Sequence, residues 1–187
     1  MFYDNVDKTH ILFDFVSFHQ CLHAKRMSIM YQNIILPNST MYDGDILRYV
    51  QRLRIPNFRG VKMRDELPSK PWKVESGVLN LNTHKQKGSH WIAWYKDNND
   101  RYYFDSFGEP PPFEILQYLK TNRELEFDLP AIKQNAVTVQ HDLSNECGSL
   151  CLFVLKYLSN GILFSEILKI LQERYEKNKG NPLSVEI

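Results

Sequence analysis

A run of apolar residues in the last quarter of the chain limits the fold more than any other feature. Residues 150–158 are apolar almost without interruption, and Cys147 and Gly148 stand just before them. A helix formed by such a run would be apolar on all sides, so it belongs at the centre of a domain. The sequence therefore predicts a buried central helix that begins at Cys147.

Length and patterning predict a single α+β domain over residues 1–187. The 187 residues, 43% of them hydrophobic, are enough to build one sizeable core. We expect an N-terminal helical and loop part at 1–77 and a part with the sheet and further helices at 78–187. The expected architecture is a small mixed or antiparallel sheet packed against helices.

Helical and alternating periodicities place the elements within these two parts. Helical spacing occurs at residues 10–25, although the segment 11–18 could also form a strand, and at 43–53, where Asp43 can act as the cap. The many prolines and glycines of residues 56–77 predict a long ordered loop. Further helices are predicted at 113–122 and 164–178, and strands at 78–81, 91–95, 102–105 and 137–140.

The composition also limits the cellular compartments in which the protein is expected. It has no apolar run of about 18 residues, so we expect no membrane-spanning helix. The first residues lack the basic and apolar regions of a signal peptide, and three cysteines fit a reducing compartment better than a disulfide framework. We therefore expect a protein that is not secreted.

Cys147 is the nucleophile that the sequence places most distinctively. At the first turn of a buried helix, free N–H groups and the helix dipole favour a thiolate. Gly148 lacks a Cβ atom and would let a substrate carbonyl approach the sulfur closely. A small buried core cysteine is the alternative, and Cys151, one turn further on, fits that description better.

His90 is the histidine best placed to serve as a base for this thiol. It follows the Gly88-Ser89 turn at a strand entrance and precedes Trp91, whose bulk can shield the imidazole and one face of a cleft. His84 lies in a polar stretch, which favours solvation. His141 could line the site without taking part in catalysis.

Asp105 and Gln140 would complete a cysteine acyl-transfer site. Asp105 ends an aromatic strand predicted to pair with the His90 strand, so it could orient the imidazole, although a turn-forming role is the alternative. Gln140, or the backbone N–H of Cys147, could donate to the oxyanion of a tetrahedral intermediate. A zinc site is disfavoured because the Cys147 and Cys151 pair lies in an apolar helix without a second ligand pair nearby.

At these residues the chain resembles the adenovirus-type (adenain-like) maturation cysteine proteases, whose clan includes the SUMO-deconjugating proteases and builds a papain-like site. It looks most like the proteases of virophages and Polinton (Maverick) elements. The resemblance implies His90 as base, Asp105 as orienting acid, Gln140 as oxyanion donor and Cys147 as nucleophile. The matching stretches are residues 55–65, 88–91, 103–108 and 147–151.

Two details of the resemblance concern the branch of the clan. Adenoviral enzymes usually have Glu where Asp105 stands, whereas the SUMO proteases have Asp. The offset of seven positions from Gln140 to Cys147 is the adenoviral spacing. No cysteine lies between Asp105 and Cys147, where the adenoviral enzyme anchors its activating peptide, so no covalent peptide cofactor is implied.

The resemblance implies an endopeptidase that cleaves viral capsid precursors during maturation, at glycine-containing sites. It would act as a monomer in the virion and the infected host cell, with no required cofactor and no membrane partner. The alternatives are a deconjugating protease for a ubiquitin-like modifier and a protease-like scaffold without activity.

A basic segment raises the question of a nucleic-acid partner. Residues 48–73 carry many Lys and Arg side chains, including Arg52 and Arg59, against only Asp65 and Glu66. Viral relatives of this type can use DNA as an activator, so viral DNA is a candidate partner. A solvated helix face followed by a loop would give the same composition.

Overall fold

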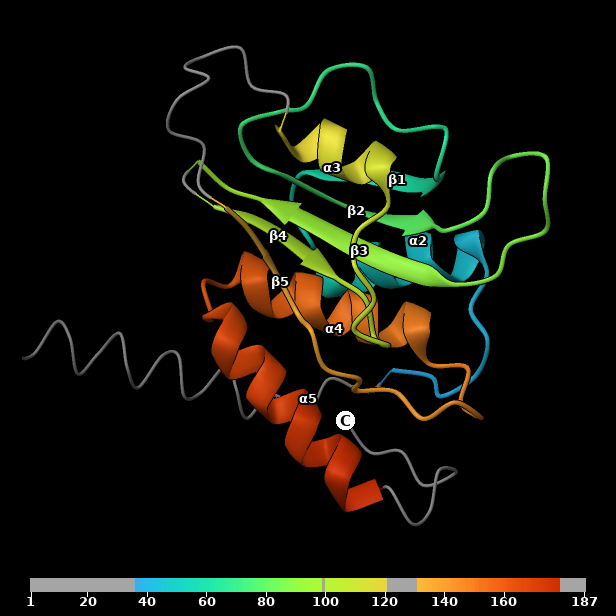
Figure 1. Cartoon of the computed structure of the whole chain (residues 1–187), viewed down its shortest axis with the longest axis vertical. Coiled ribbons are helices and arrows are strands. Elements are labelled where there is room, and N and C mark those ends of the chain that lie inside the picture. The colour runs from blue at the N-terminus through green and yellow to red at the C-terminus, as the bar shows by residue number, and fades with distance from the viewer. Residues whose placement is uncertain (1–35, 99, 121–130, 179–187) are drawn as a thin grey trace, which may run out of the picture. The chain divides into compact units, whose positions relative to one another are not determined.

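The computed structural model describes residues 36–98, 100–120 and 131–178, all within the compact unit Ile34–Ile187. The predicted helix at 10–25 and Cys21 lie outside the described residues. The elements, in chain order, are α2 (Asp43–Leu53), β1 (Phe58–Met63), β2 (Glu75–Asn80), β3 (Trp91–Lys96), β4 (Arg101–Phe104), α3 (Phe113–Lys120), β5 (Ile132–Gln134), α4 (Cys147–Ser159) and α5 (Phe164–Asn178) (Figure 1).

The five strands form one mixed sheet in the order β1-β2-β3-β4-β5. The central pairs β2–β3 and β3–β4 are antiparallel, whereas β1 and β5 run parallel to their neighbours at the two edges. The predicted α+β class is confirmed, and the sheet is mixed.

Helices cover both faces of this sheet (Figure 1). One face packs against α3, where Ile115 and Leu119 join Leu79, Trp94 and Tyr103 in a fully buried cluster. The alternation of strand side chains turns Val78, Ala93 and Phe104 to the opposite face, and α4 packs there against β3 and β2. The core therefore has two layers, one on each side of the sheet.

The central helix α4 begins at Cys147, as predicted, and ten of its residues are buried. It packs against the sheet, α2 and α5. At its start, the buried Glu146 carboxylate accepts a hydrogen bond from Arg174 of α5. The helix is therefore buried over most of its length, whereas Cys147 at its N-terminus is half-buried.

The prediction of a loop at 56–77 is wrong. This stretch contains β1 and the start of β2, and Phe58 to Met63 pair in parallel with β2 across an irregularity between Phe58 and Val61. All of β1 is half-buried, so it lacks the apolar face that marks a strand in sequence. A boundary between 77 and 78 would also cut through β2, whereas β1 and β2 belong to the same sheet.

Two smaller predictions also differ from the structure. Helix α2 is capped by Tyr42 rather than Asp43, and the Tyr42 N–H donates to the Asp45 carboxylate over 3.0 Å. Residues 137–140 form no strand. Instead, the Val139 N–H donates to the Ser106 carbonyl over 2.8 Å, which holds this extended segment against the loop after β4.

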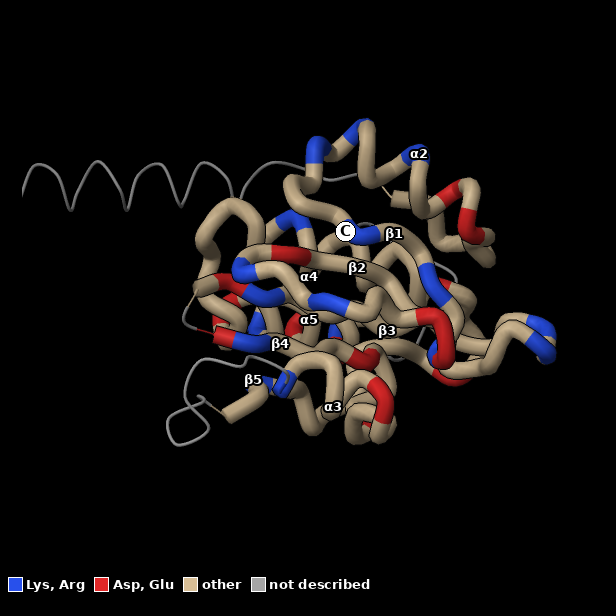
Figure 2. The backbone as a smooth tube through the Cα atoms, turned by 90° about the horizontal axis from the view of Figure 1, so that it is seen from above, with Lys and Arg blue, Asp and Glu red and all other residues tan. Residues whose placement is uncertain are grey.

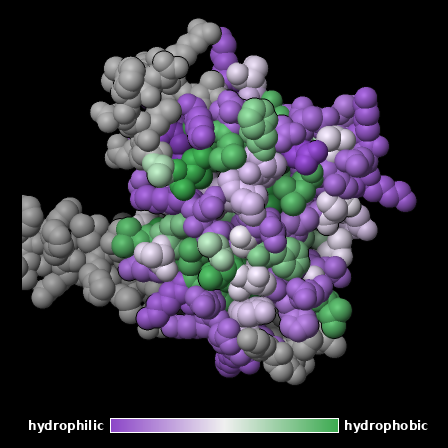
Figure 3. Space-filling view, viewed as in Figure 1, coloured by the Kyte–Doolittle hydropathy of each residue, from purple (hydrophilic) through white to green (hydrophobic). Residues whose placement is uncertain are grey.

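The surface shows a mixed polar and apolar character. In the view of Figure 3, apolar residues lie in small groups separated by hydrophilic ones. The most exposed large apolar side chains include Leu143, Tyr42 and Phe113. In the described part of the chain, no helix is both long and apolar enough to cross a membrane.

Candidate active site

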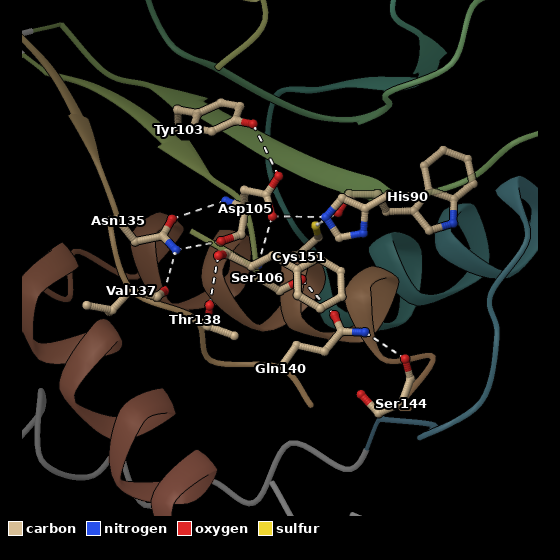
Figure 4. A network of polar contacts seen from close by, with 12 residues as sticks. His90, Tyr103, Asp105, Ser106, Asn135, Val137, Thr138, Gln140, Ser144 and Cys151 are labelled. Carbon is tan, nitrogen blue, oxygen red and sulfur yellow. Dashed lines mark hydrogen bonds and ion pairs between the residues drawn. The ribbon is translucent and has the colours of Figure 1, made fainter. Parts of the chain in front are cut away.

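The β3–β4 hairpin brings His90 and Asp105 together, as the sequence predicted. His90 immediately precedes β3 and Asp105 immediately follows β4, and the antiparallel pairing of Ala93 with Phe104 brings the two positions to the same end of the hairpin. The His90 Nε2 atom lies 3.0 Å from Asp105 Oδ1 (Figure 4). The Asp105 side chain is almost fully buried, at 1% exposure, so it forms a fixed partner for the ring.

Further hydrogen bonds hold the Asp105 carboxylate in place. The Phe107 N–H donates to Oδ1 over 2.8 Å, and the Tyr103 hydroxyl lies 3.5 Å from Oδ2. Donors to both oxygens compensate for the loss of water around a buried carboxylate. The neighbouring donors therefore fix the orientation of the Asp105 carboxylate in the absence of substrate.

His90 stands between this acid and Cys147. Burial lowers the pKa of His90, but the hydrogen bonds and negative charges of Asp105 and Cys147 outweigh burial and raise the pKa from 6.5 to about 9. The Phe107 ring also packs at 4.9 Å from the imidazole, centroid to centroid. At neutral pH the ring is therefore positively charged, and an imidazolium beside a thiolate is the reactive pair of a cysteine nucleophile.

Cys147 opens onto a cleft of about 620 Å³. It is the first residue of α4 and is half-buried, so its sulfur combines a helix N-terminus with access to solvent. His90, Trp91 and Gln140 line the same cleft. The other lining residues are Thr40, Met41, Tyr42, Asn80, Lys87, Gly88, Ser89, Phe107, Asp142, Ser144 and Asn145.

Gln140 reaches the cleft from the segment before α4 and is held by two hydrogen bonds. Its Nε2 donates to the Ser144 carbonyl over 2.8 Å, and its Oε1 accepts from the Ser106 hydroxyl over 2.6 Å (Figure 4). Gln140 is only 2% exposed. The structure therefore brings all four predicted catalytic residues, His90, Asp105, Gln140 and Cys147, to one place.

Of the predicted cleft residues, Trp91 lines the cleft, whereas Gly148 has a different role from the predicted one. The Trp91 Nε1 donates to the Met41 carbonyl over 2.8 Å. Gly148 is buried, and a Cβ there would lie 3.1 Å from Met41 Cβ and 3.4 Å from Trp91 Cδ1. Its lack of a side chain thus makes room for protein neighbours rather than for a substrate carbonyl.

His141 and Cys151 are accounted for by local contacts. His141, the third predicted cleft residue, is not among the residues that line the cleft, and its Nδ1 accepts a hydrogen bond from the Leu143 N–H over 3.3 Å. Cys151 is fully buried, with its sulfur 3.4 Å from the Trp91 carbonyl. Burial raises the pKa of the Cys151 thiol, which disfavours the thiolate there.

Asn135 is a buried site residue that no motif in the sequence predicts. Its Oδ1 accepts from the Asp105 N–H over 3.1 Å, and its Nδ2 donates to the Asp105 and Val137 carbonyls. It therefore fixes the backbone on both sides of the acid. The only local signal is a polar residue directly after a three-residue edge strand, and many loops have that feature.

Asn135→Ala should lower the free energy of unfolding by about 1–3 kcal/mol, because it leaves the buried Asp105 backbone groups without partners. Urea denaturation of both proteins would measure the loss. Asn38→Ala, at an exposed position, serves as the control. Equal stability of Asn135→Ala and the wild type would contradict the assignment.

Asp105→Asn should lower kcat/KM for the predicted cysteine acyl-transfer reaction by about 10⁴-fold, because an amide cannot stabilise the His90 imidazolium. The pKa of His90 should also fall, since the Asp105 charge helps to raise it. The limb of the kcat/KM profile that reports the imidazolium should therefore move to lower pH. Full activity with an unchanged pH profile would mean that another group orients His90.

The two predicted phosphate contacts have different surroundings. Arg52 is exposed in the last turn of α2. Figure 2 shows acidic residues near the start of this helix and basic residues further along it. Arg59 is 14% exposed in its side chain and donates to the fully buried Glu75 carboxylate over 2.8 Å. Its guanidinium also stacks on Trp72 at 4.1 Å. The charge of Arg59 is thus neutralised internally, and Arg52 is the better placed of the pair.

The described residues contain no group of three or more His, Cys, Asp or Glu side chains that could hold a metal ion. The zinc alternative for Cys147 and Cys151 therefore finds no additional ligands in this part of the chain. The chemistry that the site offers is that of a thiol, an imidazolium, a carboxylate and an amide.

Comparison with known proteins identifies a similar fold. No family model and no curated protein sequence matches the chain. A crystal structure of the Se-Met ASFV pS273R protease matches it with a TM-score of 0.51 at 16% identity, over 80% of this chain and 70% of that one. A second crystal structure of the ASFV pS273R protease gives a TM-score of 0.49 at 16% identity, over 74% and 67% of the two chains. The chain thus has an α+β fold, with a five-stranded mixed sheet and helices, that is similar to the fold of the ASFV pS273R protease.

Proposed function

We propose that this chain is a cysteine endopeptidase. The observation that carries the proposal is the position of His90, which is bonded to Asp105 at 3.0 Å and lines the same cleft as Cys147. The fold shared with the ASFV pS273R protease supports it.

The residues present can carry out every step of peptide hydrolysis. The Cys147 thiolate attacks the scissile carbonyl carbon, and the carbonyl π electrons move to oxygen, where Gln140 and the backbone N–H of Cys147 can donate hydrogen bonds. The His90 imidazolium then gives its proton to the departing amine as the C–N bond breaks. Neutral His90 next accepts a proton from water, whose oxygen attacks the acyl carbon and releases the acid and the thiolate.

We further propose viral capsid precursors as the substrates, cut at glycine-containing sites during virion maturation. The support is the resemblance to adenain-like, virophage and Polinton proteases, together with a fold similar to that of the ASFV pS273R protease. The protein would then work in virions and infected cells. The Asp at position 105 favours the deconjugating branch instead, so a modifier-processing activity is the alternative.

Incubation with the major capsid protein encoded beside this chain tests the proposal. New termini located by mass spectrometry, absent with Cys147→Ala, are expected after glycine-containing sequences. A fusion in which the diglycine tail of SUMO is followed by a reporter protein serves as the alternative substrate. Cleavage of that fusion alone would support the deconjugating activity, and cleavage of neither protein would contradict an endopeptidase of either kind.

Duplex DNA is proposed as an activator, on the strength of the exposed basic residues near the end of α2. Phosphate contacts release counterions, so stimulation should weaken steeply as salt rises. Cleavage rates with and without duplex DNA, at low and physiological salt, measure the effect. Arg52→Gln should reduce the salt dependence, whereas Arg59→Gln should act through stability. Absence of DNA binding at low salt would exclude this role.

A further inference from the structure

The orientation of the Gln140 side-chain amide is determined by two neighbours of different chemistry. The Ser144 carbonyl can only accept, so the Gln140 Nε2 must face it, as the 2.8 Å hydrogen bond requires. The amide oxygen then faces the Ser106 hydroxyl at 2.6 Å, and that hydroxyl must be the donor. With the amide turned over, two carbonyl oxygens would oppose each other at Ser144.

This orientation leaves one amide hydrogen of Gln140 for a ligand. An amide nitrogen carries two hydrogens, and one is donated to Ser144. Among the described residues no acceptor takes the second, and Gln140 lines the cleft that Cys147 opens onto. The arrangement suits the oxygen of an adduct formed on the Cys147 sulfur.

Ser106 is joined to this segment through its backbone as well as its side chain. Its carbonyl accepts from the Val139 N–H over 2.8 Å, one residue before Gln140. Ser106 is fully buried and directly follows Asp105. Two consecutive residues therefore serve the two halves of the site, since Asp105 orients the base and Ser106 contacts the oxyanion donor.

We propose that Ser106 is a positioning residue, whose hydroxyl orients the Gln140 amide so that an N–H rather than the oxygen faces the developing oxyanion. The proposal rests on the proposed cysteine-protease function. In Ser106→Ala the buried Gln140 oxygen loses its donor, and an amide without that donor can rotate away from the useful orientation.

A peptide aldehyde, acetyl-Gly-Gly-glycinal, tests this without knowledge of the natural substrate. The Cys147 sulfur adds to the aldehyde carbon, and the carbonyl oxygen takes up the electron pair and a proton, so the adduct places an oxygen at the oxyanion position. Iodoacetamide is the companion probe. It alkylates the same sulfur with loss of iodide and creates no oxyanion.

Ser106→Ala should weaken aldehyde binding about tenfold, less than the roughly 10²–10³-fold loss from removing an oxyanion donor altogether in Gln140→Ala. The rate of Cys147 alkylation should stay within about twofold of the wild type, because the change leaves His90 and Asp105 in place. Adding Ser106→Ala to Gln140→Ala should cause no further loss of aldehyde affinity. Ser76→Ala, another fully buried serine but located in β2, is the matched control and should leave both probes unaffected.

Additive losses in the double variant, or slower alkylation in Ser106→Ala, would overturn the proposal and give Ser106 a structural role. Unchanged aldehyde affinity would also overturn it. If Ser106→Ala does not fold, Ser106→Thr decides, because retention of the hydroxyl should retain aldehyde affinity and its loss would contradict the proposal. A wild-type protein whose Cys147 is alkylated but binds no aldehyde would instead overturn the proposed function itself.

Discussion

Cys147→Ala is expected to abolish peptide-bond cleavage, with a loss of about 10⁶-fold in kcat, because no other group can form the acyl-enzyme. The fold should survive the change, since the Cys147 side chain is only half-buried and the apolar residues of α4 that fill the core remain. Cleavage assays and circular dichroism on the same preparation separate the two effects.

Alkylation distinguishes Cys147 from the other cysteines. Iodoacetamide should label Cys147 ahead of Cys151, which is fully buried and whose thiol pKa is raised by burial. Peptide mapping of partly alkylated protein measures the order, and Cys21 provides a third position for comparison. Cys21→Ser should retain activity. Equal labelling of all three cysteines, or activity in Cys147→Ala, would overturn the assignment of the nucleophile.

His90→Ala should be almost as damaging as loss of the thiol, because residues that act as a catalytic unit have non-additive effects. In the proposed mechanism His90 contributes the proton for the leaving amine, and its positive charge favours the nucleophile. The double variant with Cys147→Ala should therefore be no worse than either single variant. His84→Ala is a suitable control, since His84 is exposed and bonded to Asp65. Substantial cleavage by His90→Ala would assign the base to another residue.

The charge of His90 also makes a pH-dependent contribution to stability. Its pKa is about 9 in the folded protein against the ordinary value of 6.5 that the unfolded chain has, so the folded protein holds the proton more tightly. This contribution is complete below about pH 6.5 and is lost as pH rises through about 9. Denaturation in urea across this window should show a decline in the wild type that is absent in His90→Ala. The same decline in both proteins would contradict the raised pKa.

Several elements of the site follow from sequence because their signals are local. The apolar run after Cys147 is long enough to require a buried helix, and the structure begins α4 at that residue. The hairpin that joins His90 and Asp105 follows from two alternating strands and a polar turn, since antiparallel neighbours need only a short connection. The sequence therefore predicts the candidate base, acid and thiol.

Contacts between distant segments decided the rest. Strand β1 is half-buried throughout and exists because it pairs with β2, so its own sequence carries no strand periodicity. Arg59 is an ordinary surface cation in sequence, yet a buried partner sixteen positions away, Glu75, turns it inward. The packing of Gly148 against Met41 likewise depends on a segment more than a hundred residues away in the chain.

The sequence by itself determined which chemical groups are available and the local structures that carry Cys147, His90 and Asp105. Only the tertiary structure placed Asn135 behind the acid and Ser106 behind Gln140, thirty and thirty-four residues apart in sequence. The physical reason is that a single polar side chain has many possible partners in an unfolded chain. Burial in a packed core removes water as an alternative, and the fold then selects one partner for each.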